Sequence, residues 1–225
     1  MEIPIIFEND DLIVIDKPAN LLVHPADSNP KSKTLNPKQI TLIDILKDKF
    51  PNAELVHRLD QDTSGVMVVA KNEKAYEFLK NQFLNRATKK KYTALVYGIL
   101  KDKKGIIVKS ISKSRKRGGS QTTAPIGKNR EAVTRYEVIQ EFPNYSLLEV
   151  LPETGRTHQI RVHLASIGHP IVGDDKYKFK RQKKIEGLNR QFLHAKYLKL
   201  SLLNGETKEF YSELPEELSN ILKNL

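Results

Sequence analysis

One stretch of the chain reads Leu55-Val56-His57-Arg58-Leu59-Asp60-Gln61-Asp62-Thr63-Ser64-Gly65. Its polar residues lead through a Thr-Ser-Gly turn into the apolar run at 66–70, which predicts a β-strand. A turn between two ordered elements can hold polar side chains at the mouth of a cleft, where binding and catalytic residues are concentrated. From the residues alone, Asp60 or Asp62 could equally order the turn through local hydrogen bonds.

Length and composition narrow the class of protein. The 225 residues suffice for one large domain or two small ones, and the absence of cysteine excludes disulfides and thiolate metal sites. The first residues lack the features of a signal peptide, and no apolar run approaches the roughly 18 residues of a membrane span. We therefore expect a cytoplasmic protein without a membrane partner.

Positive charge is concentrated in a few segments. The net charge is +11, and residues 101–130 hold ten Lys or Arg side chains and a single acid, Asp102. Further bases occupy 89–91 and 176–184. One Lys-rich loop would more often be a solvated segment, but several such clusters indicate a polyanion partner, most simply a nucleic-acid backbone. Glycines interrupt residues 101–130, so this part is expected to form a basic hairpin or arm.

Hydrophobic periodicity predicts helices and strands that do not alternate in a strict βαβ order. Helices are expected after the capping residues Thr41 and Asn72, from Thr157 onward, and at 214–225. Strands are expected twice within 3–16 and then at 66–70, 92–97, 133–139, 145–151 and 197–203. This pattern favours an α+β fold with a largely antiparallel sheet.

The run from His57 to Gly65 resembles the His-Arg-Leu-Asp-x-x-Thr-Ser-Gly signature of the RluA-type pseudouridine synthases. Other segments resemble further motifs of that family in the same order: 16–25, 91–96, 154–163 with its continuation 168–174, and 187–195. The first of them departs from the family pattern, because Asn20 stands in place of the usual Gly. Asn tolerates a left-handed backbone better than most residues, so this departure is mild.

The resemblance implies the pseudouridine synthase fold, in which a mixed, largely antiparallel central sheet is flanked by helices and carries a catalytic cleft. It implies one catalytic domain over residues 1–225. The S4-like RNA-binding domain that precedes this domain in many relatives is missing from the sequence, and the basic arm is expected to take over part of its role.

The resemblance assigns Asp60 as the catalytic residue, Tyr92 as the active-site tyrosine and Arg161 as the partner of Asp60. Isomerisation of uridine breaks the N1–C1′ bond and forms a C5–C1′ bond without redox change or net hydrolysis, so no cofactor is expected. A carboxylate can attack C1′ or C6, and a nearby Arg would keep it ionised. A Tyr can pack on uracil and move the C5 proton. Without the resemblance, Tyr92 would be taken as a core residue and Arg161 as a surface cation.

Further residues are expected to bind the RNA. The substrate-binding set is His57, Arg58, Thr63, Arg156, His158 and Leu193. Leu193 would line the uracil pocket, and the planar guanidinium of Arg58 could stack or bind phosphate when the target uridine is flipped out of its helix. Contacts to the RNA backbone are expected from Lys113, Arg115, Lys116 and Arg117.

Two other kinds of site have weaker support. His158 and His163 are five residues apart, which does not match the i, i+4 pair of a zinc-binding helix, so no metal is expected. Asp60 and Asp62 suggest the paired carboxylates of a glycosidase, but no other segment resembles that class.

We therefore expect a monomeric RNA pseudouridine synthase that acts on structured RNA. Residues 187–195 and the run that begins at Lys91 look closest to enzymes of 23S-type large-subunit rRNA. A tRNA or dual-specificity synthase stays open, as do a catalytically idle RNA-binding or ribosome-assembly factor and an RNA N-glycosidase.

Overall fold

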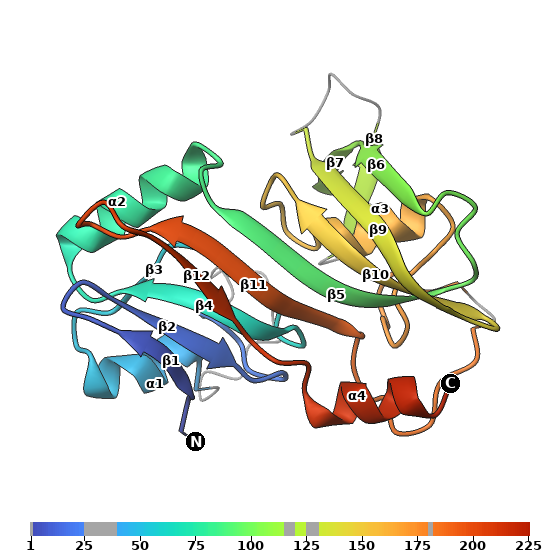
Figure 1. Ribbon diagram of the computed structural model, residues 1–225, viewed down its shortest axis with the longest axis horizontal. Coiled ribbons are helices and arrows are strands. Elements are labelled where there is room, and N and C mark those ends of the chain that lie inside the picture. Colours follow the sequence, from blue (N-terminus) through green and yellow to red (C-terminus); the bar gives the residue numbers. More distant parts are fainter. Residues whose placement is uncertain (1, 25–39, 115–119, 125–130, 180–181) are drawn as a thin grey trace. The chain divides into compact units, whose positions relative to one another are not determined.

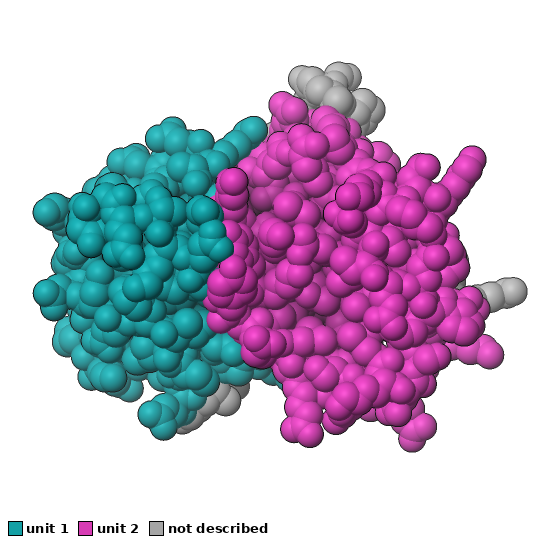
Figure 2. Space-filling model, in the orientation of Figure 1, with its two compact units in different colours: residues 1–88, 199–210 teal, residues 89–198, 211–225 magenta. Residues whose placement is uncertain are grey.

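The computed structural model describes residues 2–24, 40–114, 120–124, 131–179 and 182–225. The chain divides into two units, coloured separately in Figure 2. Unit 1 contains residues 1–88 and 199–210, and unit 2 contains residues 89–198 and 211–225.

Unit 1 is built on antiparallel strands (Figure 1). They are β1 (Ile5–Glu8), β2 (Leu12–Lys17), β3 (Glu54–Leu55) and β4 (Ser64–Ala70). Strand β2 lies between β1 and β4, and β3 also pairs with β4. All residues of β4 are buried, as are the apolar residues 12–15 of β2, so these two strands form the core of the unit.

The two helices of unit 1 begin at the residues that the sequence predicts as caps. Helix α1 (Leu42–Lys49) starts with a capping box, in which the side chains of Thr41 and Asp44 each bond to the other's backbone N–H. Helix α2 (Glu73–Leu84) is capped by Asn72, whose side-chain oxygen accepts a hydrogen bond from the N–H of Ala75 at 2.9 Å. Helix α2 then packs against β3 and β4.

Unit 2 contains four antiparallel strands in the order β5–β10–β9–β6. Their bounds are Lys89–Tyr97 for β5, Lys104–Val108 for β6, Val133–Phe142 for β9 and Tyr145–Pro152 for β10. Helix α3 (Gln159–Ser166) contacts β8, β9 and β10, and helix α4 (Glu216–Lys223) buries Leu218 and Ile221 in the core of the unit. The α+β class that the sequence predicts is confirmed.

The basic segment contains the hairpin that its composition predicts. Strands β7 (Ser110–Lys113) and β8 (Gln121–Ala124) form an antiparallel pair. We call these strands and the residues between them the basic hairpin. Lys113 is exposed at the end of β7. Arg115, Lys116 and Arg117, which are expected to contact RNA, lie outside the described residues.

Some boundaries differ from the predictions. Helix α3 begins at Gln159 rather than Thr157, because His158 has the left-handed backbone angle φ 55° and separates Thr157 from the helix. The strand expected from residue 197 is β11 (Leu193–Ser201), which lies beside β5 and continues into unit 1. It pairs with β12 (Thr207–Tyr211), which the sequence does not predict because only one of its residues, Phe210, is buried. No helix in the described part of the chain is both long and apolar enough to cross a membrane.

Candidate active site

Asp60 lies in the loop between β3 and β4 of unit 1. The carbonyl oxygen of Asp60 accepts a hydrogen bond from the backbone N–H of Thr63 at 3.1 Å, which closes a turn. The side chain of Asp60 is half-buried, whereas Thr63 is 2% exposed. The carboxylate therefore stands on an ordered backbone next to the first residues of β4.

A buried ammonium group fixes this turn. Lys17, the last residue of β2, is fully buried, and its Nζ donates hydrogen bonds to the carbonyl oxygens of Pro18, Gln61 and Thr63 at 2.7, 2.9 and 3.0 Å. A buried charge is costly unless it is hydrogen-bonded, so these contacts hold the backbone on both sides of Asp62. The sequence reasoning did not select Lys17. The available signal was a lysine at the end of an apolar strand, inside the first family-like motif.

Two other predicted residues flank the same turn. Nε2 of His57 accepts a hydrogen bond from the N–H of Val68 at 3.0 Å, and its ring stacks on Phe83 with centroids 4.5 Å apart. Arg58 is exposed, with Nη1 3.5 Å from Nε2 of His24. His57 thus ties the loop to β4 and α2, while the guanidinium of Arg58 stands at the surface.

Tyr92 lies on β5 of unit 2, where it pairs with Val150 of β10 and packs, half-buried, against the core of that unit. Lys90 precedes it by two residues and therefore shares its face of the strand. A Cβ on Gly155 would come 3.9 Å from Nζ of Lys90, so this ammonium group reaches the loop before α3. Burial lowers the pKa of Lys90 to about 8. Lys91 bonds instead to Glu149, at 3.0 Å.

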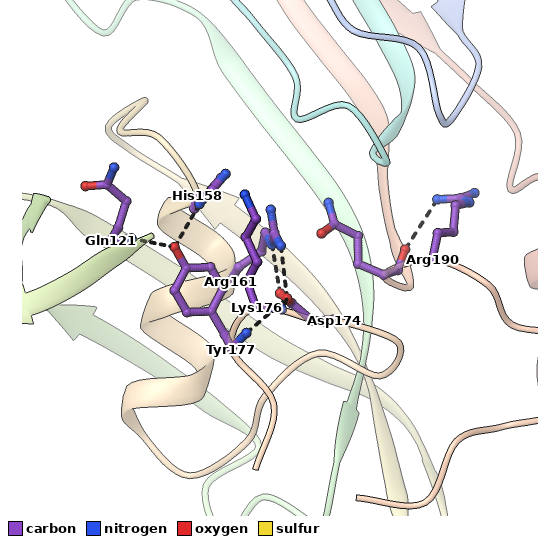
Figure 3. Close-up of polar contacts among 8 residues, drawn as sticks. Gln121, His158, Arg161, Asp174, Lys176, Tyr177 and Arg190 are labelled. Carbon is purple, nitrogen blue, oxygen red and sulfur yellow. Dashed lines mark hydrogen bonds and ion pairs between the residues drawn. The ribbon is translucent and has the colours of Figure 1, made fainter. Parts of the chain in front are cut away.

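Arg161 is held in a buried, two-pronged ion pair with Asp174 (Figure 3). Its Nε lies 2.7 Å from Oδ2, and its Nη2 lies 2.9 Å from Oδ1. The two side chains are 6% and 0% exposed. Asp174 Oδ1 also accepts hydrogen bonds from the backbone N–H groups of Lys176 and Tyr177 at 2.8 and 3.1 Å. This geometry fixes the plane of the guanidinium as well as its charge.

The loop before α3 is organised by a residue that the sequence reasoning missed. The side-chain oxygen of Gln159 accepts hydrogen bonds from the hydroxyl of Thr154 at 2.6 Å and from the N–H of Arg156 at 3.0 Å. Its Nε2 donates to the carbonyl oxygen of Val133 at 2.9 Å. Gln159 thereby joins this loop to β9. The side chain of Arg156 is half-buried, and its Nε lies 3.5 Å from the carbonyl oxygen of Glu131.

Leu193 opens β11 and is buried in the core of unit 2. Arg190, itself 4% exposed, donates from Nη1 to the carbonyl oxygen of Leu193 at 3.4 Å. The backbone of Arg190 also meets Gly173 closely, because a Cβ on Gly173 would come 2.1 Å from the carbonyl oxygen of Arg190. Gly173 has φ +77°, so both sterics and conformation require glycine next to Asp174.

The histidine of α3, His163, makes contacts within unit 2. His163 is buried, with Nδ1 2.9 Å from the hydroxyl of Thr134 and Nε2 3.1 Å from the carbonyl oxygen of Lys109. Burial lowers the pKa of His163. Within the residues that the structure describes, no three His, Asp or Glu side chains are grouped so that they could hold a metal ion.

The structure thus places the predicted residues in two sets. Unit 1 carries Asp60 with His57, Arg58 and Thr63, and unit 2 carries Tyr92 and Arg161 with Arg156, His158 and Leu193. In unit 2, the chemistry available is a fixed guanidinium, a half-buried phenol and an amine of lowered pKa. In unit 1, it is a carboxylate on an anchored turn.

The comparisons with known proteins point in one direction. A family profile described as RNA pseudouridylate synthase matches residues 11–166. The uncharacterized RNA pseudouridine synthase YlyB of Bacillus subtilis is 38% identical over 227 residues, which is 100% of this chain and 73% of that protein. The ribosomal large subunit pseudouridine synthases D and C of Haemophilus influenzae are 37% and 36% identical; the matches cover 98% and 100% of this chain and 70% and 69% of those proteins.

A solved structure agrees with this result. The human RNA pseudouridylate synthase domain containing 4 matches with a TM-score of 0.79 and 27% sequence identity. The match covers 99% of this chain and 92% of the human chain.

Proposed function

Because this chain belongs to the RNA pseudouridylate synthase family, of the RluA type, we propose that it converts specific uridines of large-subunit ribosomal RNA to pseudouridine. The protein is an isomerase that acts on RNA. The observation that carries the choice of RNA is its 37% and 36% identity to two synthases named for the large ribosomal subunit. An enzyme of ribosomal RNA works where ribosomes assemble, and we accordingly expect it in the cytoplasm.

In the proposed mechanism, Asp60 is the nucleophile. Its carboxylate attacks C1′ of the ribose or C6 of the base and holds one fragment while the N1–C1′ bond breaks and the base turns. The C5–C1′ bond then forms, the bond to Asp60 breaks and frees its carboxylate, and Tyr92 moves the proton that leaves C5 while N1 takes up a proton. The position of Asp60 on a turn anchored by Lys17 supports this role, because a nucleophile must be held close to its target geometry.

We propose Arg161 as the partner of Asp60, whose carboxylate its charge would keep ionised, and as the group that stabilises negative charge in the reaction. Its support is the bidentate pair with Asp174, which holds a buried guanidinium in one plane. Arg58, which is exposed and stands two residues before Asp60, is proposed to stack in the space that a flipped uridine vacates or to bind a phosphate. Thr63 and His57 are proposed to shape the same part of the site, and His158, Arg156 and Leu193 to complete the substrate contacts in unit 2.

The RNA backbone is proposed to bind the basic hairpin through Lys113, Arg115, Lys116 and Arg117. Each phosphate contact contributes about 0.7 to 0.9 to the slope of log affinity against log salt. If most of the four contact phosphate, changing all of them to Gln should lower that slope by roughly 2 to 3 units and leave turnover at saturating RNA nearly unchanged. An unaltered slope would return the hairpin to the role of a solvated loop.

We propose that both units act together as one catalytic domain over residues 1–225, and that this domain works as a monomer. The family profile supports the single domain, because the matched residues 11–166 run from unit 1 into unit 2. The proposed reaction involves no redox change and no net hydrolysis, so we expect no cofactor.

The test is tritium release from RNA labelled at C5 of uridine, together with mapping of pseudouridine by reverse transcription. Large-subunit rRNA and tRNA transcripts are offered separately. The wild type should release tritium from the rRNA, and Asp60→Asn should abolish release because an amide cannot replace the attacking carboxylate. Asp62→Asn, which changes the neighbouring carboxylate, serves as the matched control and should retain activity.

Residual turnover of Asp60→Asn within tenfold of the wild type would remove Asp60 from its role. Modification of tRNA alone would contradict the choice of substrate, and free uracil as the product would replace the isomerase with an N-glycosidase.

A further inference from the structure

Tyr177 lies at the centre of the polar network of unit 2 and touches four of its parts (Figure 3). Its hydroxyl oxygen accepts a hydrogen bond from the backbone N–H of Gln121 at 2.8 Å and lies 2.7 Å from Nδ1 of His158. The guanidinium carbon of Arg161 lies 5.2 Å from the centre of the Tyr177 ring. The backbone N–H of Tyr177 bonds to Asp174 at 3.1 Å.

These contacts place two restraints on the same guanidinium. Asp174 holds the edge of Arg161 through two hydrogen bonds, and the aromatic face of Tyr177 attracts its positive charge. The tyrosine ring also meets the ring of His158 edge to face, with centroids 5.6 Å apart. His158 is the left-handed residue immediately before α3, so the hydroxyl of Tyr177 fixes the start of the helix that carries Arg161.

The same hydroxyl attaches the basic hairpin. Gln121 is the first residue of β8 and pairs with Lys113 of β7. A small apolar cluster adds to this attachment, since Ile111 of the hairpin packs with Val162 of α3 against the Tyr177 ring. The hairpin and the start of α3 therefore share one side chain, although they are far apart in sequence.

We propose that Tyr177 is a positioning residue of the reaction: it holds the guanidinium of Arg161 in place and ties that position to the attachment of the basic hairpin. This inference rests on the proposed role of Arg161 in pseudouridine formation. Its physical basis is preorganisation, because a charge that is held in place before the reaction stabilises the transition state without being reoriented. Networks of this kind can contribute more than the sum of their separate contacts.

Tyr177→Phe tests the proposal, because it removes the two hydroxyl contacts and keeps the ring beneath Arg161. We expect kcat at saturating RNA to fall by about fivefold to tenfold, with little change in KM. The free energy of one hydrogen bond corresponds to a change of about that size in the rate. Tyr136→Phe is the matched control. Tyr136 is a half-buried tyrosine of β9 in the same unit, and the Tyr136→Phe variant should keep the kcat of the wild type.

A double-mutant cycle separates positioning from general stabilisation of the fold. In an Arg161→Lys background, which keeps the charge beside Asp174, Tyr177→Phe should lower kcat by less than about twofold, because the residue through which it acts has already changed. Equal effects of Tyr177→Phe in both backgrounds would overturn the proposal.

Hydrogen exchange gives a second readout that does not depend on turnover. In Tyr177→Phe the amide of Gln121 should exchange several-fold faster than in the wild type, while amides in the core strand β5 exchange as before. An unchanged exchange rate of the Gln121 amide would show that the hydroxyl of Tyr177 does not hold the basic hairpin in place. If the wild type itself formed no pseudouridine, the proposed function would fail, and the exchange result would still report on the network.

Discussion

The ammonium nitrogen of Lys17 lies 3.0 Å from the carbonyl oxygen of Thr63, 46 residues further along the chain. Lys17 ends β2, and Thr63 stands immediately before β4, its antiparallel partner. The bond therefore joins the ends of two neighbouring core strands just where the turn of Asp60 enters β4. It makes the geometry of the proposed nucleophile depend on the sheet beneath it.

Replacing Lys17 by Met should destabilise the protein and lower its activity. The carbonyl oxygens of Pro18, Gln61 and Thr63 would lose a buried donor, which corresponds to about 2–5 kcal/mol of unfolding free energy. Urea denaturation gives this quantity directly. Lys104→Met is the control, because Lys104 is 73% exposed and pairs with Glu137 at the surface; it should lose less than about 1 kcal/mol. Equal losses of unfolding free energy in the two variants would mean that the buried hydrogen bonds of Lys17 stabilise the protein no more than a surface ion pair does.

Tyr92→Phe should keep RNA affinity and slow the chemical step, because the ring still packs while the phenol proton is gone. Single-turnover kinetics with saturating RNA measure that step. Tyr97→Phe is the control on the same strand, since its hydroxyl bonds to the carbonyl oxygen of Lys183 instead. A fall in affinity with an unchanged chemical rate would make Tyr92 a packing residue.

Arg161→Lys should cost about 1–3 kcal/mol of unfolding free energy, because lysine keeps the charge but cannot form the planar two-pronged pair with Asp174. Arg161→Met should cost more, about 3–5 kcal/mol, since it leaves the buried carboxylate without its cation. Both should lower kcat. Arg156→Lys, at a half-buried position in the preceding loop, should leave the unfolding free energy nearly unchanged. Chemical denaturation of the wild type and these three variants measures the unfolding free energies. It would decide whether Arg161 contributes more to stability than Arg156.

The lowered pKa of Lys90 predicts a specific pH dependence. The unfolded chain binds this proton up to about pH 10.5 and the folded protein only up to about pH 8, so stability rises relative to a Lys90→Met variant between these values. Below pH 8 both states are protonated and the difference is constant. Lys90 is partly exposed, so we expect the gain to stay below about 3 kcal/mol.

Urea denaturation at pH 7, 8, 9 and 10 measures that gain. The exposed neighbour Lys89, changed to Met, is the control and should differ from the wild type by the same amount at every pH. A Lys90→Met difference that also stays constant from pH 8 to 10 would show that Lys90 keeps an ordinary pKa.

Much of the fold could be predicted because its signals are local. Thr41 and Asn72 cap helices as expected, and Asn20 has φ 62°, the left-handed conformation that its place in the first motif calls for. The hairpin of β7 and β8 follows from the breakers in a polar segment. Each of these features depends on a few neighbouring residues and their backbone preferences.

The missed features depend on contacts between distant parts of the chain. Neither the triple hydrogen bonding of Lys17 nor the bridge of Gln159 to Val133 leaves a periodic signal in the sequence. The pairing of Arg161 with Asp174 joins two family-like motifs, but nothing in either segment specifies a bidentate geometry. Resemblance to a family supplied the candidate residues and the expected pairing of Arg161 with Asp60, whereas the structure supplied the contact of Arg161 with Asp174.

The division of the chain also has a consequence for protein synthesis. Unit 1 takes residues 1–88 from the start of the chain and 199–210 from near its end, and the ring of Phe7 in β1 packs against Phe210 of β12, with centroids 5.5 Å apart. When the ribosome has synthesised the first 88 residues, it has not yet made Phe210, the partner of Phe7. The second unit must be translated before the first is finished, so an apolar surface on the nascent chain stays uncovered through most of elongation and is a natural point for a chaperone to bind.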